Sequence, residues 1–95
     1  MHFLILALRT PDFDPDILPG HRAFLEDLRE RGLLAAHGPF IDQSGSAYVL
    51  RAESIAEAEA IAATDPLGSS GAAELAVWAW EVNWSPTGSC GTPSS

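Results

Sequence analysis

The order of strand-like and helix-like segments constrains this chain more than any other feature of its sequence. Two segments carry apolar residues three and four positions apart, as amphipathic helices do, and four are short apolar or alternating runs typical of strands. In chain order we expect a strand over 2–9, a helix over 17–31, strands over 33–40 and 47–52, a helix over 54–64 and a strand over 74–84. Strand, helix, strand, strand, helix, strand is the order of the split βαβ unit.

Local signals agree with these boundaries. Asp16 is a suitable N-cap for the first helix, and Gly32 ends that helix. Ser54 and Glu57 have the spacing of a capping box at the start of the second helix. Two stretches rich in Ser and Gly are expected to be a hairpin loop and a second loop, over 42–46 and 67–71.

The sequence therefore predicts an α+β domain with a ferredoxin-like βαββαβ fold. Its four-stranded antiparallel sheet would place the first strand between the third and the fourth, with both helices on one face. A chain of 95 residues has room for one such domain. We assign the domain to residues 1–84 and expect residues 85–95 to be a flexible tail, which holds the single cysteine, Cys90.

This topology gathers residues that form poor regular structure at one end of the domain. The first strand ends there, the first helix begins there, the hairpin lies there and the second helix ends there. The residues expected at this end are Arg9, His21, Gly38, Pro39, Phe40, Asp42, Asp65 and Pro66. We expect the imidazole of His21 to lie beside the carboxylate of Asp65, and such a pair suits acid–base catalysis. The same pair could instead be structural, tying the loop after the second helix to the first helix.

Several residues are expected to bind a substrate. The predicted substrate-binding residues are Arg9, Gly38, Pro39, Phe40 and Trp80. Trp80 could instead belong to the core or the dimer interface, or it could serve both the interface and the pocket. Arg9 would hold a ligand carboxylate, or alternatively form a surface ion pair with Asp12 or Asp14. His37 is either a second site residue or a half-exposed strand residue. No metal site is expected, because His2 begins the first strand at the end opposite His21 and metal ligands must converge on one ion.

The other face of the predicted sheet lacks a cover. The first strand is apolar on both sides, and Trp78, Trp80 and Trp84 share one side of the last strand. An exposed apolar patch of this kind is a liability unless another surface covers it. We therefore expect a homodimer in which two sheet faces pack together under two-fold symmetry.

Composition excludes several classes of function. The net charge of −8, from 13 acidic residues against 5 arginines, opposes binding to nucleic acid and to anionic membranes. The absence of lysine excludes Schiff-base chemistry on a lysine side chain. The apolar run at 3–8 is too short for a membrane span or a signal peptide, so a cytoplasmic protein is expected.

The chain resembles the YCII-related proteins of the dimeric α/β-barrel group. The resemblance rests on the N-terminal apolar strand, the helix PGHRAFLEDLRERG at 19–32 and the Gly38-Pro39 pair that follows it. It continues in the Glu- and Ala-rich helix over 54–62, the Asp65-Pro66 pair and the closing strand, and it covers residues 1–82. The chain departs from the family pattern at His37 and in its tryptophan-rich last strand.

The resemblance implies a fold and a candidate site. Members carry a His–Asp pair regarded as an active site, and the matching positions here are His21 and Asp65. It implies a small cofactor-independent enzyme of the isomerase or lyase type, acting on a small aromatic-derived or lactone-like substrate. The alternatives are a module that only binds a small ligand and a module that only dimerises.

Overall fold

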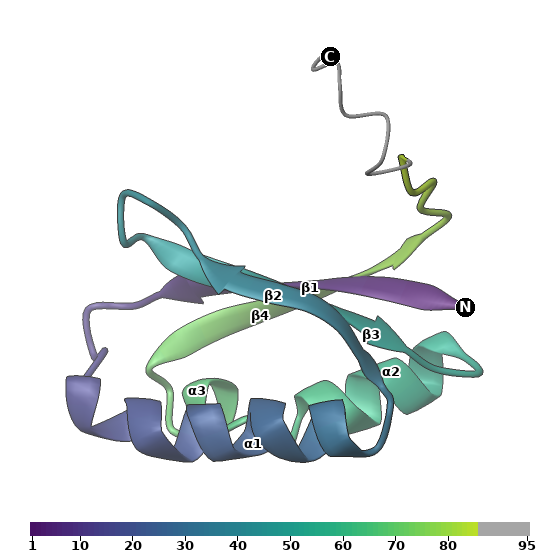
Figure 1. Cartoon of the computed structure of the whole chain (residues 1–95). Helices are drawn as coiled ribbons and strands as arrows, with labels where there is room; N and C mark the ends of the chain where they lie inside the picture. The colour runs from purple at the N-terminus through teal and green to yellow at the C-terminus, as the bar shows by residue number, and fades with distance from the viewer. Residues whose placement is uncertain (86–95) are drawn as a thin grey trace.

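Four antiparallel strands form a sheet, and all the helices lie against one of its faces (Figure 1). The computed structural model describes residues 1–85. The elements are β1 (His2–Arg9), the 3-10 helix η1 (Pro15–Ile17), α1 (Leu18–Glu30), β2 (Leu34–Pro39), β3 (Gly45–Arg51), α2 (Ile55–Ala62), α3 (Pro66–Ser69) and β4 (Ala73–Trp80). The strand order β2-β3-β1-β4 confirms the predicted ferredoxin-like topology. The predicted tail at 85–95, with Cys90, lies outside the described residues apart from Ser85.

The core lies between the sheet and the helices. Along β1, Phe3, Ile5 and Ala7 are buried, whereas the residues between them are partly exposed. Successive side chains of a strand point to opposite faces, so these three face the helices. Leu25 and Leu28 of α1 are buried against the same side. The apolar side chains of α1 and those on one face of β1 therefore pack together in one apolar layer.

The first helical segment begins differently from the prediction. The predicted N-cap at Asp16 is wrong, because the side chain of Asp14 accepts the hydrogen bond, and its donor is the backbone N–H of Asp16. Pro15 follows the cap, and proline suits the first helical position since it has no N–H to satisfy there. A single 3-10 turn results, and α1 continues from Leu18.

The loop expected at 67–71 is also wrong in part. Residues Pro66–Ser69 form α3, with Asp65 as its N-cap. Asp-Pro is the same cap-and-proline signal as Asp14-Pro15, and it ends one helix and starts another within three residues. The last strand is shorter than expected, since β4 ends at Trp80 and Trp84 lies beyond it.

Gly45, at the start of β3, is a position where the chain needs glycine. A Cβ atom there would overlap the backbone carbonyl oxygen of Ala7 on the neighbouring strand. We expect Gly45→Ala to lower the free energy of unfolding by about 3 kcal/mol, measured by urea denaturation. Gly38→Ala is the control, because a Cβ there meets nothing within 4 Å. A loss for Gly45→Ala no larger than for the control would contradict the close approach of the two strands.

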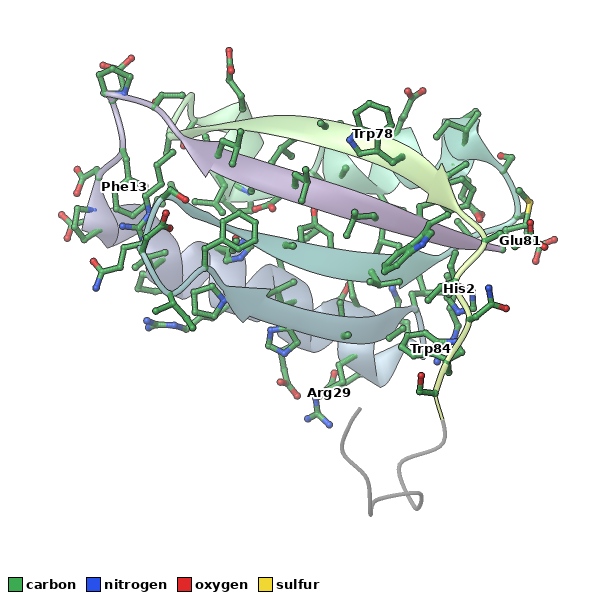
Figure 2. All side chains as sticks on the ribbon, turned by 90° about the horizontal axis from the view of Figure 1, so that it is seen from above. His2, Phe13, Arg29, Trp78, Glu81 and Trp84 are labelled. Atoms are coloured by element: carbon green, nitrogen blue, oxygen red, sulfur yellow. The ribbon has the colours of Figure 1, made fainter. Side chains whose placement is uncertain are left out.

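The face of the sheet opposite the helices is mostly apolar. We call it the open sheet face, and along β1 and β4 it carries Leu4, Leu6, Leu8, Ala76, Trp78 and Trp80, with His2 and Glu74 at its two ends. Leu4 lies opposite Trp78 in the register of β1 and β4, so the two side chains share this face. Figure 2 views the face directly, with Trp78 lying over the outer strand. The exposed fractions of Trp78 and Trp80 are 59% and 43%.

Candidate active site

His21 and Asp65 are in direct contact, as the sequence predicted. His21 lies in the first turn of α1, and Asp65 precedes α3, 44 positions further along the chain. The imidazole Nδ1 is 2.9 Å from Oδ1 of the carboxylate. Asp65 is completely buried and His21 is 7% exposed, so the pair is shielded from solvent. A hydrogen bond of this kind is stronger in such surroundings than in water.

Three donors surround the Asp65 carboxylate. Its Oδ1 accepts from the backbone N–H of Leu67 at 2.9 Å as well as from His21, and its Oδ2 accepts from the hydroxyl of Tyr48 at 3.3 Å. The carboxylate therefore caps α3, orients the imidazole of His21 and accepts a hydrogen bond from Tyr48 of β3. Buried carboxylates are tolerated when their oxygens are hydrogen-bonded in this way.

Tyr48 is a site residue that the sequence analysis missed. It lies in the middle of β3 opposite Ile5, so its ring faces the helices. Burial raises the pKa of its hydroxyl, and the negative charge of Asp65 raises it further. Tyr48 therefore stays neutral, and its hydroxyl donates a hydrogen bond to the carboxylate. A tyrosine on the buried side of a strand that starts at the site could have signalled this role, since a buried hydroxyl needs a partner.

Aromatic neighbours hold the imidazole of His21 in place. The ring of Phe24 is stacked at 6.3 Å between centroids, and the ring of Tyr48 lies at 6.4 Å. Since the carboxylate of Asp65 accepts only, Nδ1 carries the proton in the neutral imidazole, which leaves Nε2 with a free lone pair. Nε2 makes no hydrogen bond to any residue within 1–85.

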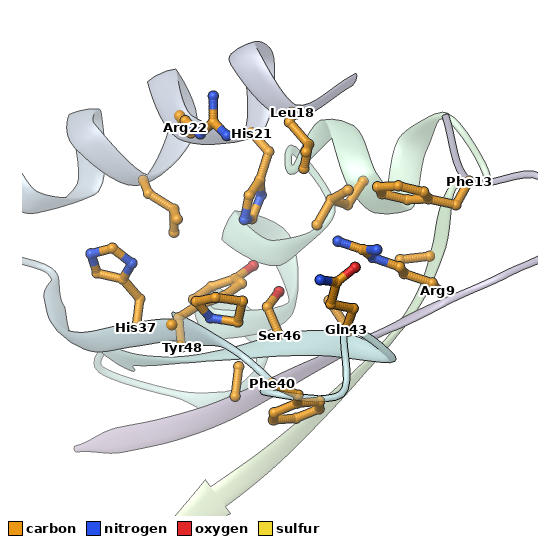
Figure 3. A pocket seen from close by; sticks show the side chains of 18 of the residues that line it. Arg9, Phe13, Leu18, His21, Arg22, His37, Phe40, Gln43, Ser46 and Tyr48 are labelled. Atoms are coloured by element: carbon orange, nitrogen blue, oxygen red, sulfur yellow. The ribbon is translucent and has the colours of Figure 1, made fainter. Parts of the chain in front are cut away.

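A pocket of about 720 Å³ opens beside His21. Its walls come from α1, from the turn between β2 and β3, and from the adjoining ends of β1 and β4 (Figure 3). Pockets that bind small molecules have volumes of this order. His21 and Tyr48 line it, while Asp65 lies behind His21 and does not.

The structure brings most of the predicted substrate-binding residues to this pocket. Arg9, Gly38, Pro39 and Phe40 all line it. Trp80 does not, because it lies opposite His2, at the far end of β1 from Arg9. Trp80 also lies on the open sheet face, whereas the pocket lies between α1 and the other face of the sheet.

The sequence left two interpretations open for Arg9 and for His37, and both residues line the pocket. The guanidinium of Arg9 lies 4.0 Å from the centre of the Phe13 ring, and within residues 1–85 it forms no ion pair with Asp12 or Asp14. His37 is exposed and lines the wall of the pocket.

Among the described residues, no three His, Cys, Asp or Glu side chains are grouped as metal ligands would be. None of the described helices is both long enough and apolar enough to cross a membrane.

Fold and site together define a ferredoxin-like α+β protein with a buried histidine–aspartate pair beside a small-molecule pocket. The chain belongs to the YCII-related domain family, whose model matches residues 1–81. It is 40% identical over 80 residues to the uncharacterised protein YjpA of Bacillus subtilis, a match that spans 84% of this chain and 94% of YjpA.

A solved structure of similar fold comes from Burkholderia phenoliruptrix. It is the 5-chloro-2-hydroxyhydroquinone dehydrochlorinase TftG, in complex with 2,5-dihydroxybenzoquinone. The TM-score is 0.75 at 26% sequence identity, and the alignment covers 87% of this chain and 96% of TftG. The family and the fold expected from the sequence are both confirmed.

Proposed function

We propose that this protein is a small cofactor-independent enzyme of the isomerase or lyase type. His21 is its general acid and base, and Asp65 orients the imidazole. The observation that carries the proposal is how the imidazole of His21 is hydrogen-bonded. Its Nδ1 is bound to the buried carboxylate of Asp65, whereas its Nε2 has no protein partner within residues 1–85, and His21 lines the pocket. A buried carboxylate behind an imidazole selects one tautomer and stabilises the imidazolium that forms when Nε2 takes a proton.

A lyase reaction of the kind named for TftG fits these residues. In the dehydrochlorination of a chlorinated hydroxyhydroquinone, one hydroxyl proton first moves to the ring carbon that carries chlorine, which makes that carbon tetrahedral. A second hydroxyl then loses its proton as chloride leaves, so one HCl departs and the hydroxyquinone forms. Nε2 of His21 would accept the proton and pass it to water after the chloride departs. This stoichiometry needs no electron acceptor, so the proposal requires neither a metal nor a redox cofactor. The substrate is a small hydroxylated aromatic ring or a lactone.

The second candidate function is a module that binds a small ligand, or only dimerises, without catalysis. Its support is the low exposure of the pair, since the His21 side chain is 9% exposed and that of Asp65 is fully buried. Such burial also suits a purely structural polar contact.

Turnover of a chlorinated hydroxyhydroquinone tests the proposal. The purified chain is incubated under anaerobic conditions with 5-chloro-2-hydroxyhydroquinone, and released chloride is measured together with the absorbance of the hydroxyquinone product. The proposal expects chloride release at a rate proportional to enzyme concentration. A lactone panel, followed by changes in the NMR spectrum, tests the isomerase form. If neither substrate class turns over above the rate without protein, the binding or dimerisation module is the better description.

We also propose that two copies pair through the open sheet face. Leu8, Trp78 and Trp80 are each more than 40% exposed there, and burying such aromatic surface favours association. Light scattering after size exclusion is expected to give twice the 10.1 kDa mass of one chain at micromolar concentration. Trp78→Glu should shift the mass to that of a monomer, whereas Arg29→Gln, on helix α1 at the other face of the sheet, should not. A monomer mass for the unaltered chain would contradict the pairing.

A further inference from the structure

We infer that the pocket selects a small ligand that is an anion at neutral pH, and that Arg9 binds its negative group. This inference rests on the proposed function, since it names the substrate class of the same pocket. The ionised group is a carboxylate or the oxygen of an acidic enol or phenol. Both present oxygen acceptors that suit a guanidinium.

The first argument is the distribution of charge. The chain has 13 acidic residues and a net charge of −8, yet none of its aspartates or glutamates lines the pocket. Two of its five arginines, Arg9 and Arg22, do line it, and so do His21 and His37. A strongly acidic protein has therefore kept the walls of one pocket free of carboxylates. The local field there favours an anion, against the field of the whole molecule.

The second argument is that the other arginines already have partners. Arg29 pairs with Glu26, and Arg31 pairs with Asp27 at 3.4 Å. Arg51 donates to the backbone carbonyls of Gly32 and Leu34. These three side chains therefore have acceptors on the protein itself.

Arg9 and Arg22 differ from those three. Within residues 1–85, neither guanidinium donates a hydrogen bond to a protein acceptor. Arg9 packs over the ring of Phe13 instead, a contact that fixes the plane of the guanidinium and leaves its N–H groups free. A positioned but unpaired guanidinium at a pocket is suited to bind a carboxylate or enolate.

Neighbouring carboxylates do not neutralise these cations. Asp65 is completely buried behind His21 and accepts three hydrogen bonds. Asp42 lies in the turn but does not line the pocket, and its carboxylate accepts from both the backbone N–H and the hydroxyl of Ser44. Those two hydrogen bonds lower the pKa of Asp42. Both of these carboxylates are thus engaged with the protein.

Gln43 adds a neutral donor to the lining of the pocket. It lies in the turn between β2 and β3, and its φ of 64° is the only positive value of a non-glycine residue in the described part of the chain. This left-handed conformation costs a glutamine about 1 kcal/mol, and strain of this kind is often retained at ligand sites. Figure 3 shows the Gln43 amide and the Arg9 guanidinium on one side of the pocket, with His21 above. The anionic group of the ligand would lie near Arg9, and its reacting atom near His21.

A pair of probes with the same ring tests the charge preference. At pH 7, 2,5-dihydroxybenzoquinone is ionised, and its dimethyl ether, 2,5-dimethoxybenzoquinone, is neutral. Binding is measured by calorimetry on the full chain carrying Cys90→Ser, which prevents alkylation of the thiol by the quinone. We expect the ionised probe to bind at least tenfold more tightly than the ether. Benzoate is a third probe, which separates a carboxylate preference from an enolate preference.

Variants then locate the preference. Arg9→Gln is expected to weaken binding of the ionised probe about tenfold or more and to leave binding of the ether within twofold. Gln43→Gly removes the second donor while relieving its φ, so it should weaken binding in a chain that remains folded. Arg31→Gln is the matched control, because it removes the same charge outside the pocket, and it should change neither affinity.

Three outcomes would overturn the inference. They are equal affinity for the ether and the ionised probe, an equal effect of Arg31→Gln and Arg9→Gln, and no binding of any probe at millimolar concentration. The chloride-release assay is separate from all three. Turnover with no charge preference would refute this inference and leave the proposed function standing. Tight binding of the anion without turnover would support this inference and refute the proposed catalytic function.

Discussion

Asp65→Ala is expected to lower the free energy of unfolding by about 3–5 kcal/mol, measured by urea denaturation followed through tryptophan fluorescence. Removing one member of a buried hydrogen-bonded pair leaves its partners without acceptors, and Asp65 itself is completely buried. Here the substitution orphans Nδ1 of His21, the hydroxyl of Tyr48 and the N–H of Leu67 together. It also removes the N-cap of α3, which alone is worth about 1 kcal/mol.

Two less severe variants separate these contributions. Tyr48→Phe removes a single hydrogen bond to the carboxylate and should cost about 1 kcal/mol. Asp65→Asn keeps an oxygen that can cap α3, so its loss should lie between those of the other two variants. If Asp65→Ala costs no more than Tyr48→Phe, the carboxylate is not the centre of the network that the distances indicate.

His21→Gln is expected to reduce the turnover number for chloride release by about 10²–10⁴-fold, the usual contribution of a general acid or base. The glutamine amide can still donate to Asp65, so the fold should persist. It cannot take up a proton at neutral pH, so the chemical step should be lost while substrate affinity changes little. Steady-state kinetics with separate values for kcat and KM measure both effects.

His37→Gln is the matched control for that experiment. His37 lines the same pocket but is exposed, and no hydrogen bond ties its ring to a residue within 1–85. Its replacement should change kcat by less than about threefold. Should His21→Gln raise KM and leave kcat intact, His21 binds the substrate and a different group transfers the proton. Should both variants behave alike, the buried pair has no special part in the reaction.

The fold was predictable because its signals are local and repeated. The alternation in β1 and the helical spacing of His21, Leu25 and Leu28 each follow from one face meeting the core. Once the order of elements is known, chain direction alone brings the start of α1 and the end of α2 to the same edge. His21 and Asp65 could therefore be paired without knowing any side-chain geometry.

The rest of the site depends on facts that the sequence pattern does not carry. Tyr48 reads as an ordinary strand residue, and only the register of β3 against β1 places its hydroxyl at Asp65. Arg22 reads as part of the solvent-facing side of α1, yet it reaches the wall of the pocket. Trp80 was expected at a pocket shared with the dimer interface, whereas the pocket lies between α1 and the sheet, and Trp80 lies on the open sheet face.

The double role of Asp65 has a consequence for the motions of this protein. One carboxylate both begins α3 and holds the imidazole, so the segment around α3 cannot open without releasing His21. Local unfolding of that segment and disassembly of the site are then a single event. The backbone N–H of Leu67 donates to Oδ1 of Asp65, the same oxygen that binds the imidazole. Exchange of this amide hydrogen with deuterated water therefore measures how often the site comes apart. That one backbone amide serves as a built-in reporter of the assembled state, in the absence of any substrate.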